Sequence, residues 1–218
     1  RVVFADADDY EILKAARFAC EEGIAYPTLL GKRKKIEALM NEYALEITEF
    51  EIVDPKSEEE EERRIRFGAA FFEKRKRKGF TEFESVQIMR ERNHFGAMMV
   101  ELGEADAMIS GLTRNYRDVV RPAIQTIGTQ KDVNTVAGLY ILMTKRGPLF
   151  LADTTINMDP TAEEIAEITS NVAKTIRKFK VTPKIALLSY SNFGSSPGKD
   201  ADKMAQAVEI LHEKYPSI

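Results

Sequence analysis

The stretch RVVFADADDYEILKAARFACEEGIAYPTLLG, residues 1–31, decides the fold class of this chain. Residues 2–4 form a short apolar run of the kind found in buried strands, and Asp8 with Glu11 has the spacing of a capping box that starts a helix. Residues 28–30 form the next apolar run, after the helix has ended. A strand, a helix and a second strand in this order predict a βα unit of a mainly parallel sheet.

The same alternation continues beyond this unit. A third short strand is expected at 52–53, a helix over 57–78, a helix from Thr81 that continues to Gly103, a strand at 107–109 and a helix capped by Asp118. The sequence therefore predicts an α/β fold of two lobes, with a mainly parallel sheet and helices on both faces.

A second lobe is expected after the polar stretch 128–134, which places the lobes at 1–130 and 131–218. The apolar runs 136–143 and 149–152 are joined by Thr144-Lys145-Arg146-Gly147-Pro148 and predict an antiparallel hairpin. A capping box at Thr161 and Glu164 starts a helix, residues 185–188 read as a strand, and a final helix carries Met204, Val208 and Leu211.

Composition excludes several classes of protein. The chain has 218 residues, 44% of them hydrophobic, which supports a packed core and excludes disorder as the main state. A net charge of −3 argues against nucleic-acid binding, and the absence of a long apolar run or signal peptide argues against a membrane protein. We expect a cytoplasmic protein, and the missing initiator Met indicates a piece of a longer chain.

Cysteine and histidine give no indication of a metal site. Cys20 is the only cysteine, and His94 and His212 lie too far apart in sequence for a local zinc motif. We expect Cys20 to be a small core residue, His94 to be a surface or buried hydrogen-bonded side chain, and His212 to face solvent. Glycine-rich phosphate loops and a Gly-x-Ser-x-Gly elbow are also absent.

Two loops after predicted strands are rich in polar side chains. Ligands of open α/β sheets bind beyond the carboxyl ends of the strands. The loop 110–116 precedes a helix and suits a phosphate or a polar acyl group, although an ordinary turn has a similar composition. The loop 189–198 is long for a plain connection. The candidate ligand-binding residues are Ser110, Thr113, Arg114, Asn115, Ser191, Asn192, Gly194 and Ser195.

Two further sites of interest carry charge. Asp153 follows a predicted strand, and we expect its carboxylate to hold a neighbouring loop by hydrogen bonds rather than to take part in catalysis. Between Arg63 and Lys78 the chain has eight Lys or Arg and one Glu. This run is typical of a solvated helix, and the alternative is an anion site at or near Arg75.

Several segments taken together resemble the phosphate acetyltransferase family, and the resemblance spans nearly the whole chain. They are Lys74-Arg75-Lys76-Arg77-Lys78-Gly79, residues 93–111, Val120-Arg121-Pro122-Ala123-Ile124-Gln125, and residues 153–164. The loops Ser110-Gly111-Leu112-Thr113-Arg114-Asn115-Tyr116 and Ser189-Tyr190-Ser191-Asn192-Phe193-Gly194 resemble in particular the C-terminal domain of bacterial NADP-dependent malic enzymes. There, a phosphate-acetyltransferase-like module follows the malic enzyme domain.

The resemblance implies the phosphate acetyltransferase or isocitrate dehydrogenase-like fold, whose cleft takes acetyl-CoA and phosphate. In this reading the eight residues of the two loops bind acetyl-CoA, and Arg75 and Arg121 bind phosphate and acyl phosphate, because a planar guanidinium pairs two phosphate oxygens at once. The resemblance also implies a homo-oligomer and a malic enzyme domain in the same polypeptide. That domain uses NADP and a divalent metal for the oxidative decarboxylation of malate to pyruvate.

Two departures from the family pattern affect the expected activity. Where this chain has Leu112-Thr113-Arg114-Asn115-Tyr116, the acetyltransferases have a small loop rich in hydroxyls or His. Where it has Asn192-Phe193, they have a loop that contains Lys. They also continue beyond Ile218 with a serine and an aspartate assigned to thiol activation, so we expect a C-terminally truncated chain with no intact catalytic set. The preferred reading is an acetyl-CoA-binding regulatory domain of a malic enzyme. The alternatives are an active phosphate acetyltransferase and an oligomerisation scaffold.

Overall fold

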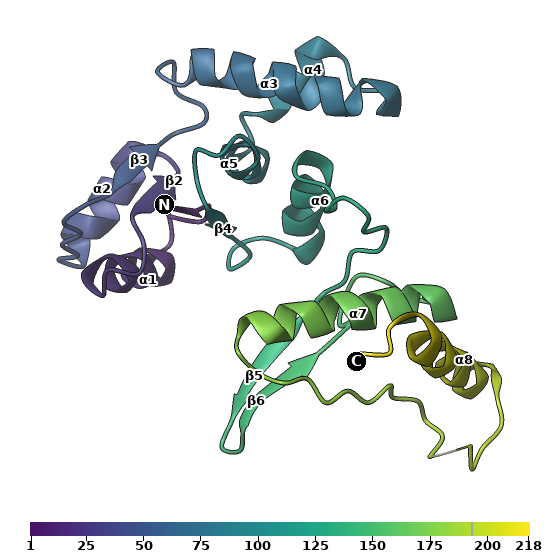
Figure 1. Ribbon diagram of the computed structural model, residues 1–218. Coiled ribbons are helices and arrows are strands. Elements are labelled where there is room, and N and C mark those ends of the chain that lie inside the picture. The colour runs from purple at the N-terminus through teal and green to yellow at the C-terminus, as the bar shows by residue number, and fades with distance from the viewer. Residues whose placement is uncertain (193) are drawn as a thin grey trace. The chain divides into compact units, whose positions relative to one another are not determined.

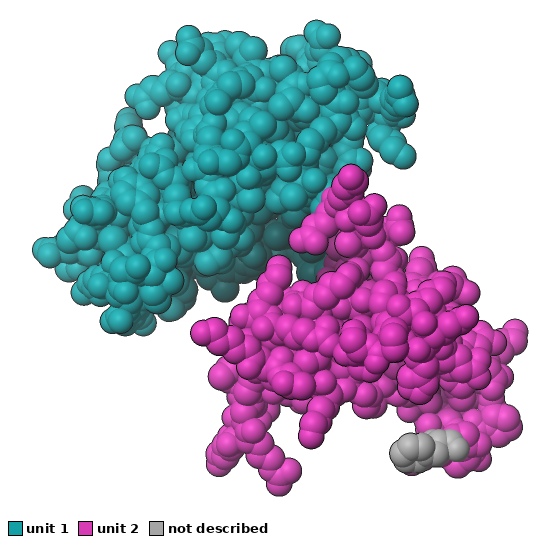
Figure 2. Space-filling view, viewed as in Figure 1, with its two compact units in different colours: residues 1–128 teal, residues 129–218 magenta. Residues whose placement is uncertain are grey.

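The computed structural model of this chain describes residues 1–192 and 194–218 (Figure 1). They form two compact units, Arg1–Gly128 and Thr129–Ile218, which Figure 2 shows in different colours. The lobes predicted from the sequence were 1–130 and 131–218.

Unit 1 is built on a four-stranded sheet with the order β3-β2-β1-β4. All neighbouring strands run parallel, and β1 lies between β2 and β4. This confirms the predicted α/β class with a mainly parallel sheet. The strands are β1 (Val2–Phe4), β2 (Pro27–Leu30), β3 (Glu51–Val53) and β4 (Ala107–Ile109).

Helices pack on both faces of this sheet, because successive side chains of a strand point to opposite sides. Val3 and Leu30 belong to an apolar cluster with residues of α3 and α5, whereas Phe4 and Leu29 belong to a second cluster with residues of α1 and α2. The helices of unit 1 are α1 (Tyr10–Glu21), α2 (Arg33–Glu42), α3 (Glu61–Arg75), α4 (Glu82–Ile88), α5 (Arg92–Glu101) and α6 (Tyr116–Thr126).

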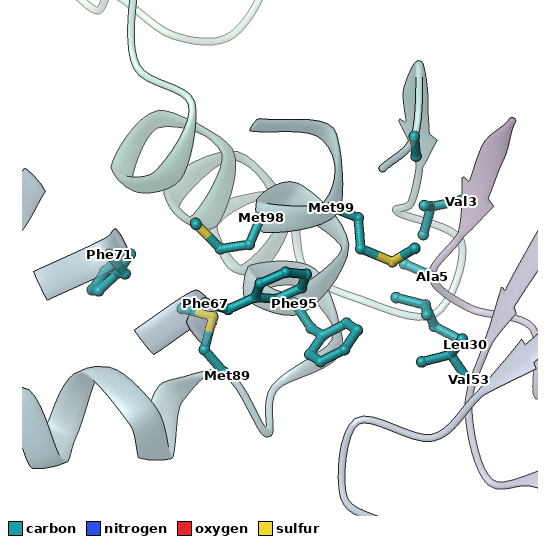
Figure 3. Packing of buried hydrophobic residues seen from close by; sticks show 11 residues of the cluster. Val3, Ala5, Leu30, Val53, Phe67, Phe71, Met89, Phe95, Met98 and Met99 are labelled. Atoms are coloured by element: carbon teal, nitrogen blue, oxygen red, sulfur yellow. The ribbon is translucent and has the colours of Figure 1, made fainter. Parts of the chain in front are cut away.

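The first cluster is centred on two phenylalanines. Phe67 of α3 and Phe95 of α5 have ring centroids 4.9 Å apart, and both side chains are fully buried. Figure 3 shows them beside Met98 and Met89. This packing joins the α3–α4 hairpin to α5, and α5 in turn lies against the sheet.

Three helix boundaries differ from the sequence analysis. The helix expected over 57–78 begins only at Glu61, and after Arg75 it continues as a single 3₁₀ turn. The helix expected from Thr81 to Gly103 is two helices, because Glu91 interrupts it and accepts hydrogen bonds from the first N–H groups of α5. The capping box of Thr81 with Glu84 is confirmed.

The start of α1 also differs. Asp9, not Asp8, is the N-cap, and it accepts the backbone N–H of Glu11. Asp8 instead forms a two-pronged ion pair with Arg92, with Oδ1 2.6 Å from Nη1 and Oδ2 3.2 Å from Nη2, and a further pair with Lys35. A contact with a residue 84 positions away carries no local sequence signal.

The ion pair of Asp8 should make stability depend on acid pH. The hydrogen bond from Arg92, assisted by Lys35, lowers the pKa of Asp8 from 3.8 to about 2. Because the pKa of Asp8 is lower in the folded protein than in the unfolded one, the ion pair stabilises the fold at pH values above the unfolded-state pKa. This stabilisation is lost as pH falls from about 4 to about 2. After discounting for solvent screening we expect about 1 kcal/mol at neutral pH.

Urea unfolding of the wild type and of Asp8→Asn at several pH values measures this contribution. The difference in unfolding free energy between the two proteins should be present at pH 7 and should shrink below pH 4. A difference that stays constant down to pH 2.5 would show that the charge of Asp8 is not what matters.

Unit 2 contains a hairpin and two helices. The hairpin of β5 (Tyr140–Thr144) and β6 (Gly147–Leu151) is antiparallel, which confirms that prediction, although residues 136–139 precede the strand. The helices are α7 (Ala162–Lys178) and α8 (Lys199–Lys214), and the capping box of Thr161 with Glu164 is confirmed. Ile165 of α7 and Ala207 of α8 pack in one small core.

The strand expected at 185–188 is not formed. Residues 181–189 have no regular secondary structure, and within the described residues their backbone makes no hydrogen bond to another strand. An apolar run becomes a strand only where a neighbouring strand supplies hydrogen-bond partners. The hydrophobic pattern and the composition of residues 185–188 do not reveal whether such a neighbouring strand is present.

No helix among residues 1–192 and 194–218 is long and apolar enough to cross a membrane. In the same residues, no group of three or more His, Cys, Asp and Glu side chains is placed to hold a metal ion.

Candidate functional site

The order of the strands in the sheet of unit 1 reverses at β1. β2 and β3 follow one another on one side of β1, and β4, which comes later in the sequence, pairs with the other side, with Phe4 opposite Ile109. In open α/β sheets, ligands bind at such a switch in strand order. Asp6 follows β1 and the loop 110–116 follows β4, so both lie at this position.

The carboxylate of Asp6 fixes the loop 110–116. Asp6 is fully buried, and it accepts the backbone N–H of Gly111 at 3.0 Å and the hydroxyl of Thr113 at 2.6 Å. The hydroxyl of Ser110 donates to Oδ1 of Asn93 at 2.8 Å. The hydroxyl protons of Ser110 and Thr113 are therefore committed within the protein, and the loop is held without a ligand.

The same network reaches α6 through a proline. Pro122 lies inside α6 and has no N–H to donate to the carbonyl of Asp118, four residues earlier. The side-chain amide of Asn93 donates to this carbonyl at 2.9 Å instead. Asn93 is fully buried and thus connects α5, the loop and α6.

Three arginines line one pocket of about 410 Å³ in unit 1. Arg114 comes from the loop, and Arg117 and Arg121 lie one turn apart on the same face of α6. Phe80 and Ile88 contribute apolar surface. Within residues 1–192 and 194–218, none of the three guanidinium groups donates a hydrogen bond or forms an ion pair. We call this the arginine pocket.

Two carboxylates, Glu91 and Asp118, and His94 also line the arginine pocket. Nδ1 of His94 lies 3.1 Å from Oε2 of Glu91, and Nε2 lies 3.1 Å from Oε1 of Gln125. Burial acts to raise the pKa of Glu91, but hydrogen bonds from His94 and from the backbone of Asn93 outweigh it and lower the pKa. Glu91 is therefore ionised at neutral pH, and its Oε2 atom already accepts hydrogen bonds from Asn93 and His94. Of the two alternatives predicted for His94, the buried and hydrogen-bonded one is confirmed.

Arg75 lies elsewhere. Its Nε donates to the carbonyl of Gln125 at 2.7 Å, and its Nη2 donates to the carbonyl of Ile124 at 2.7 Å. A cation at the C-terminus of a helix satisfies carbonyls that have no helical partner and complements the helix dipole. Arg75 thus ties α3 to the end of α6 and does not line the arginine pocket. Its contact with an anion stays a prediction.

The helix cap next to the loop differs from the sequence analysis. α6 begins at Tyr116 with Asn115 as the N-cap, and Asp118, the expected cap, lies within the first turn. Nδ2 of Asn115 is 3.5 Å from Oδ2 of Asp118, so the two side chains face each other. The structure brings Arg114 and Arg121 together in one pocket, and Asn115 is not among the residues that line it.

The second predicted loop belongs to unit 2. The backbone N–H of Ser195 donates to the carbonyl of Asn192 in a turn, and Ser191 Oγ accepts the N–H of Ser196. Gly194 adopts φ +79°, a conformation that favours glycine. Phe193 lies outside the described residues. A role of this loop in binding acetyl-CoA stays a prediction.

The structural role predicted for Asp153 is confirmed. Its carboxylate accepts backbone N–H groups of Gly138, Thr155, Ile156 and Asn157. Burial acts to raise the pKa of Asp153, and these backbone hydrogen bonds outweigh it and lower the pKa. Asp153 therefore organises the loop after β6 and is not available as a base.

Three residues of the site were missed by the sequence analysis. Asp6 comes directly after a predicted strand, and the rule that was applied to later loops would have found it. Arg117 is four residues from Arg121, a helical spacing that indicates a shared face. Asn93 gave no signal, because its role depends on the missing N–H of Pro122 in another helix.

Comparison with known proteins places these features in a family. The whole chain, residues 1–218, matches the sequence profile of the family described as phosphate acetyl/butaryl transferase. It is 35% identical to a phosphate acetyltransferase of Synechocystis sp. and 35% identical to an NADP-dependent malic enzyme of Escherichia coli, in both cases over 100% of this chain. The chain spans only 31% and 29% of the length of these two relatives.

Solved structures agree with this match. A phosphotransacetylase from Streptococcus pyogenes has a TM-score of 0.86 and 30% sequence identity, over 100% of this chain and 65% of that one. Profile, sequence and fold therefore lead to one conclusion, that this chain belongs to the phosphate acetyl/butaryl transferase family, whose relatives include both phosphate acetyltransferases and malic enzymes.

Proposed function

We propose that this chain is an acetyl-CoA-binding regulatory domain of an NADP-dependent malic enzyme. Its similarity to the malic enzyme of Escherichia coli extends over the whole chain. In this proposal acetyl-CoA is the effector and phosphate a second ligand. A malic enzyme domain of the same polypeptide carries out the oxidative decarboxylation with NADP and a divalent metal, and the protein is a cytoplasmic homo-oligomer.

The observation that carries the proposal is the contrast between bound hydroxyls and unpaired arginines. The hydroxyl protons of Ser110 and Thr113 are donated to Asn93 and Asp6. Arg114, Arg117 and Arg121, in contrast, keep their donors for a ligand. Acyl transfer needs a base and stabilisation of an oxyanion, whereas anion binding needs only fixed cations. The site is therefore better equipped to bind than to react.

The chemistry of coenzyme A fits this pocket. Its diphosphate offers several oxygens to planar guanidinium groups, which pair with phosphate in two-pronged geometry. A volume of about 410 Å³ lies within the usual range of small-molecule sites. Phe80 and Ile88 add apolar contact area for the uncharged part of a ligand.

The alternative function is acetyl transfer between CoA and phosphate. It is favoured by the similarity to the phosphotransacetylase from Streptococcus pyogenes and by the pairing of Glu91 with His94 in the arginine pocket. An assay of CoA release from acetyl-CoA and phosphate separates the two functions. The regulatory proposal expects no turnover above the buffer rate, and clear turnover would favour the acetyltransferase.

Arg121→Ala is expected to weaken acetyl-CoA binding by about 1.5 to 3 kcal/mol, the worth of a charge-assisted hydrogen bond. The fold should survive, because Arg121 is exposed and makes no contact that supports the core. Arg121→Lys should recover only part of the loss, since an ammonium keeps the charge but not the two-pronged geometry. Calorimetric titration of the whole polypeptide with acetyl-CoA measures both effects.

Arg17→Ala is the matched control, because Arg17 lies on α1 and pairs with Glu21 on the surface. It should leave the affinity unchanged. If Arg121→Ala instead leaves the affinity unchanged and lowers the melting temperature, Arg121 is a structural residue and the proposed site is wrong.

A further inference from the structure

His94 is a buried histidine whose two ring nitrogens both face an oxygen atom. It is 7% exposed and belongs to the lining of the arginine pocket. Nδ1 lies 3.1 Å from Oε2 of Glu91, and Nε2 lies 3.1 Å from Oε1 of Gln125. A neutral imidazole has one N–H donor, whereas the charged imidazolium has two. Two oxygen atoms around the ring therefore suit the charged form.

Gln125 can serve both forms of His94, because its side-chain amide has an oxygen at one end and N–H groups at the other. With Oε1 toward the ring it accepts a hydrogen bond from imidazolium, and after a half turn of the amide it donates one to the neutral ring. The backbone of Gln125 stays fixed, since Nε of Arg75 donates to its carbonyl at 2.7 Å. His94 can thus gain or lose a proton without leaving a buried nitrogen unpaired.

Charged groups on the neighbouring elements act on the protonation of His94. Glu91, the N-cap of α5, favours the charged form, and its own pKa is lowered by its hydrogen bonds with His94 and Asn93. The N-terminus of α5 opposes a positive charge, because the helix dipole is positive there. From α3 the ring is faced by uncharged Phe71. The other charged side chains that line the arginine pocket are Asp118, Arg114, Arg117 and Arg121.

An anion in the arginine pocket changes this balance. Without a ligand, the three arginines and the helix N-terminus oppose one more positive charge. A phosphate-bearing ligand pairs with the arginines and adds negative charge, which favours imidazolium. Among the described residues that line the pocket, only His94 is of a type that ordinarily changes charge between pH 5 and 8. Glu91 stays ionised in that range, so a proton taken up there belongs on His94.

We propose that His94 takes up a proton when an anionic ligand binds in the arginine pocket, and that the pocket therefore holds its ligand more tightly at lower pH. The ligand class is a phosphate ester or diphosphate. The sign follows from linkage, because a ligand that favours the protonated form binds better where protons are more abundant. This inference rests on the proposed function of the arginine pocket, and it makes the response to the effector depend on pH.

Calorimetric titration of the whole polypeptide in two buffers of different ionisation enthalpy counts the protons taken up per ligand. The probe is dephospho-CoA, because its diphosphate keeps its charge between pH 6 and 8. The wild type should take up a fraction of one proton at pH 7. Its affinity should fall about fivefold from pH 6 to pH 8, the lower end of the usual coupling between two sites.

His94→Gln should bind dephospho-CoA without proton uptake, and its affinity should be independent of pH and approach that of the wild type at pH 8. An affinity that is lowered equally at every pH would show a structural role and overturn the inference. His212→Gln is the matched control, because it removes an exposed histidine of α8 in unit 2. It should keep the proton uptake of the wild type.

Gln125→Met removes the oxygen that faces Nε2 and provides the answer if His94→Gln does not fold. It should lose most of the proton uptake, since imidazolium then has no acceptor at Nε2. Full uptake in Gln125→Met would overturn the role of Gln125, and full uptake in His94→Gln would assign the proton to another group.

The remaining outcomes separate this inference from the proposed function. If the wild type binds dephospho-CoA without proton uptake and with one affinity from pH 6 to pH 8, while Arg121→Ala weakens binding, the inference fails but the arginine pocket stands. If dephospho-CoA does not bind at all, both proposals fail.

Discussion

Asp6→Ala is expected to lower the free energy of unfolding by about 3 to 5 kcal/mol and to abolish acetyl-CoA binding. Asp6 is fully buried and accepts hydrogen bonds from Gly111 and Thr113. Removing its carboxylate leaves the N–H of Gly111 and the hydroxyl of Thr113 without their acceptor and leaves the loop that carries Arg114 unsupported. The effect on affinity is therefore indirect, through the position of Arg114.

Thermal unfolding and calorimetric titration measure the two effects. The melting temperature should fall by about 10 °C, given a shift of roughly 2 to 4 °C per kcal/mol for a protein of this size. Asp6→Asn keeps the shape and one acceptor oxygen and should recover part of the stability. Partial recovery of affinity in Asp6→Asn would show that hydrogen bonding to the loop is the cause.

Asp106→Ala is the matched control. Asp106 lies next to β4 but is exposed, so its loss should cost less than about 1 kcal/mol. If Asp6→Ala costs no more than Asp106→Ala, the loop is held by other contacts and the account of this network is wrong.

Gly68→Ala is expected to destabilise unit 1 by about 3 kcal/mol, even though alanine favours a helix by about 1 kcal/mol over glycine. Gly68 of α3 faces α4 so closely that a Cβ atom would lie 2.6 Å from Cγ2, 2.7 Å from Cα and 2.8 Å from N of Val86. Two of these three atoms belong to the backbone, so a change of rotamer cannot relieve the contact. The helices must separate, and Phe67 and Phe71 lose packing.

Gly96→Ala provides the comparison, because Gly96 is also a helical glycine in close contact. A Cβ there would lie 2.7 Å from Sδ of Met108 and 3.1 Å from the side chains of Leu30 and Val3. These are the ends of side chains, and methionine adapts readily, so Gly96→Ala should cost less than Gly68→Ala. Urea unfolding gives both values, and the reverse order would contradict the backbone contact.

Val86→Ala tests the same contact from the other helix. It removes Cγ2 but leaves Cα and N in place, so it should not restore the stability of Gly68→Ala. Full rescue by Val86→Ala would show that only the side chain of Val86 was in contact.

Local patterns were sufficient for the fold class and for several details of unit 2. Alternating strands and helices predicted the parallel sheet because each element buries one apolar face at its own period. The box of Thr161 with Glu164 lies within four residues, so its hydrogen bonds depend on local sequence alone. The same is true of Asp153, most of whose donors follow it directly.

The resemblance carried by the loops and by the run around Arg121 led to the correct family. It paired Arg121 with Arg75 and assigned Arg114 to a separate set, whereas the structure places Arg114 and Arg121 in one pocket. The resemblance did not reveal that the hydroxyl protons of Ser110 and Thr113 are already donated within the protein. Residue type shows which groups can bind a ligand. Whether those groups are still available depends on what the fold places beside them.

By itself, then, the sequence determined the α/β class, the hairpin and the capping boxes that begin with Thr81 and Thr161. Only the tertiary structure decided the roles of Asp6 and Arg75, because their partners lie far away in sequence, 107 residues for Thr113 and 49 for Ile124. It also decided that residues 185–188 form no strand, since a strand needs a hydrogen-bonded neighbour. Local pattern fixes which face of an element is apolar, and the packing of distant elements fixes which polar groups remain unpaired.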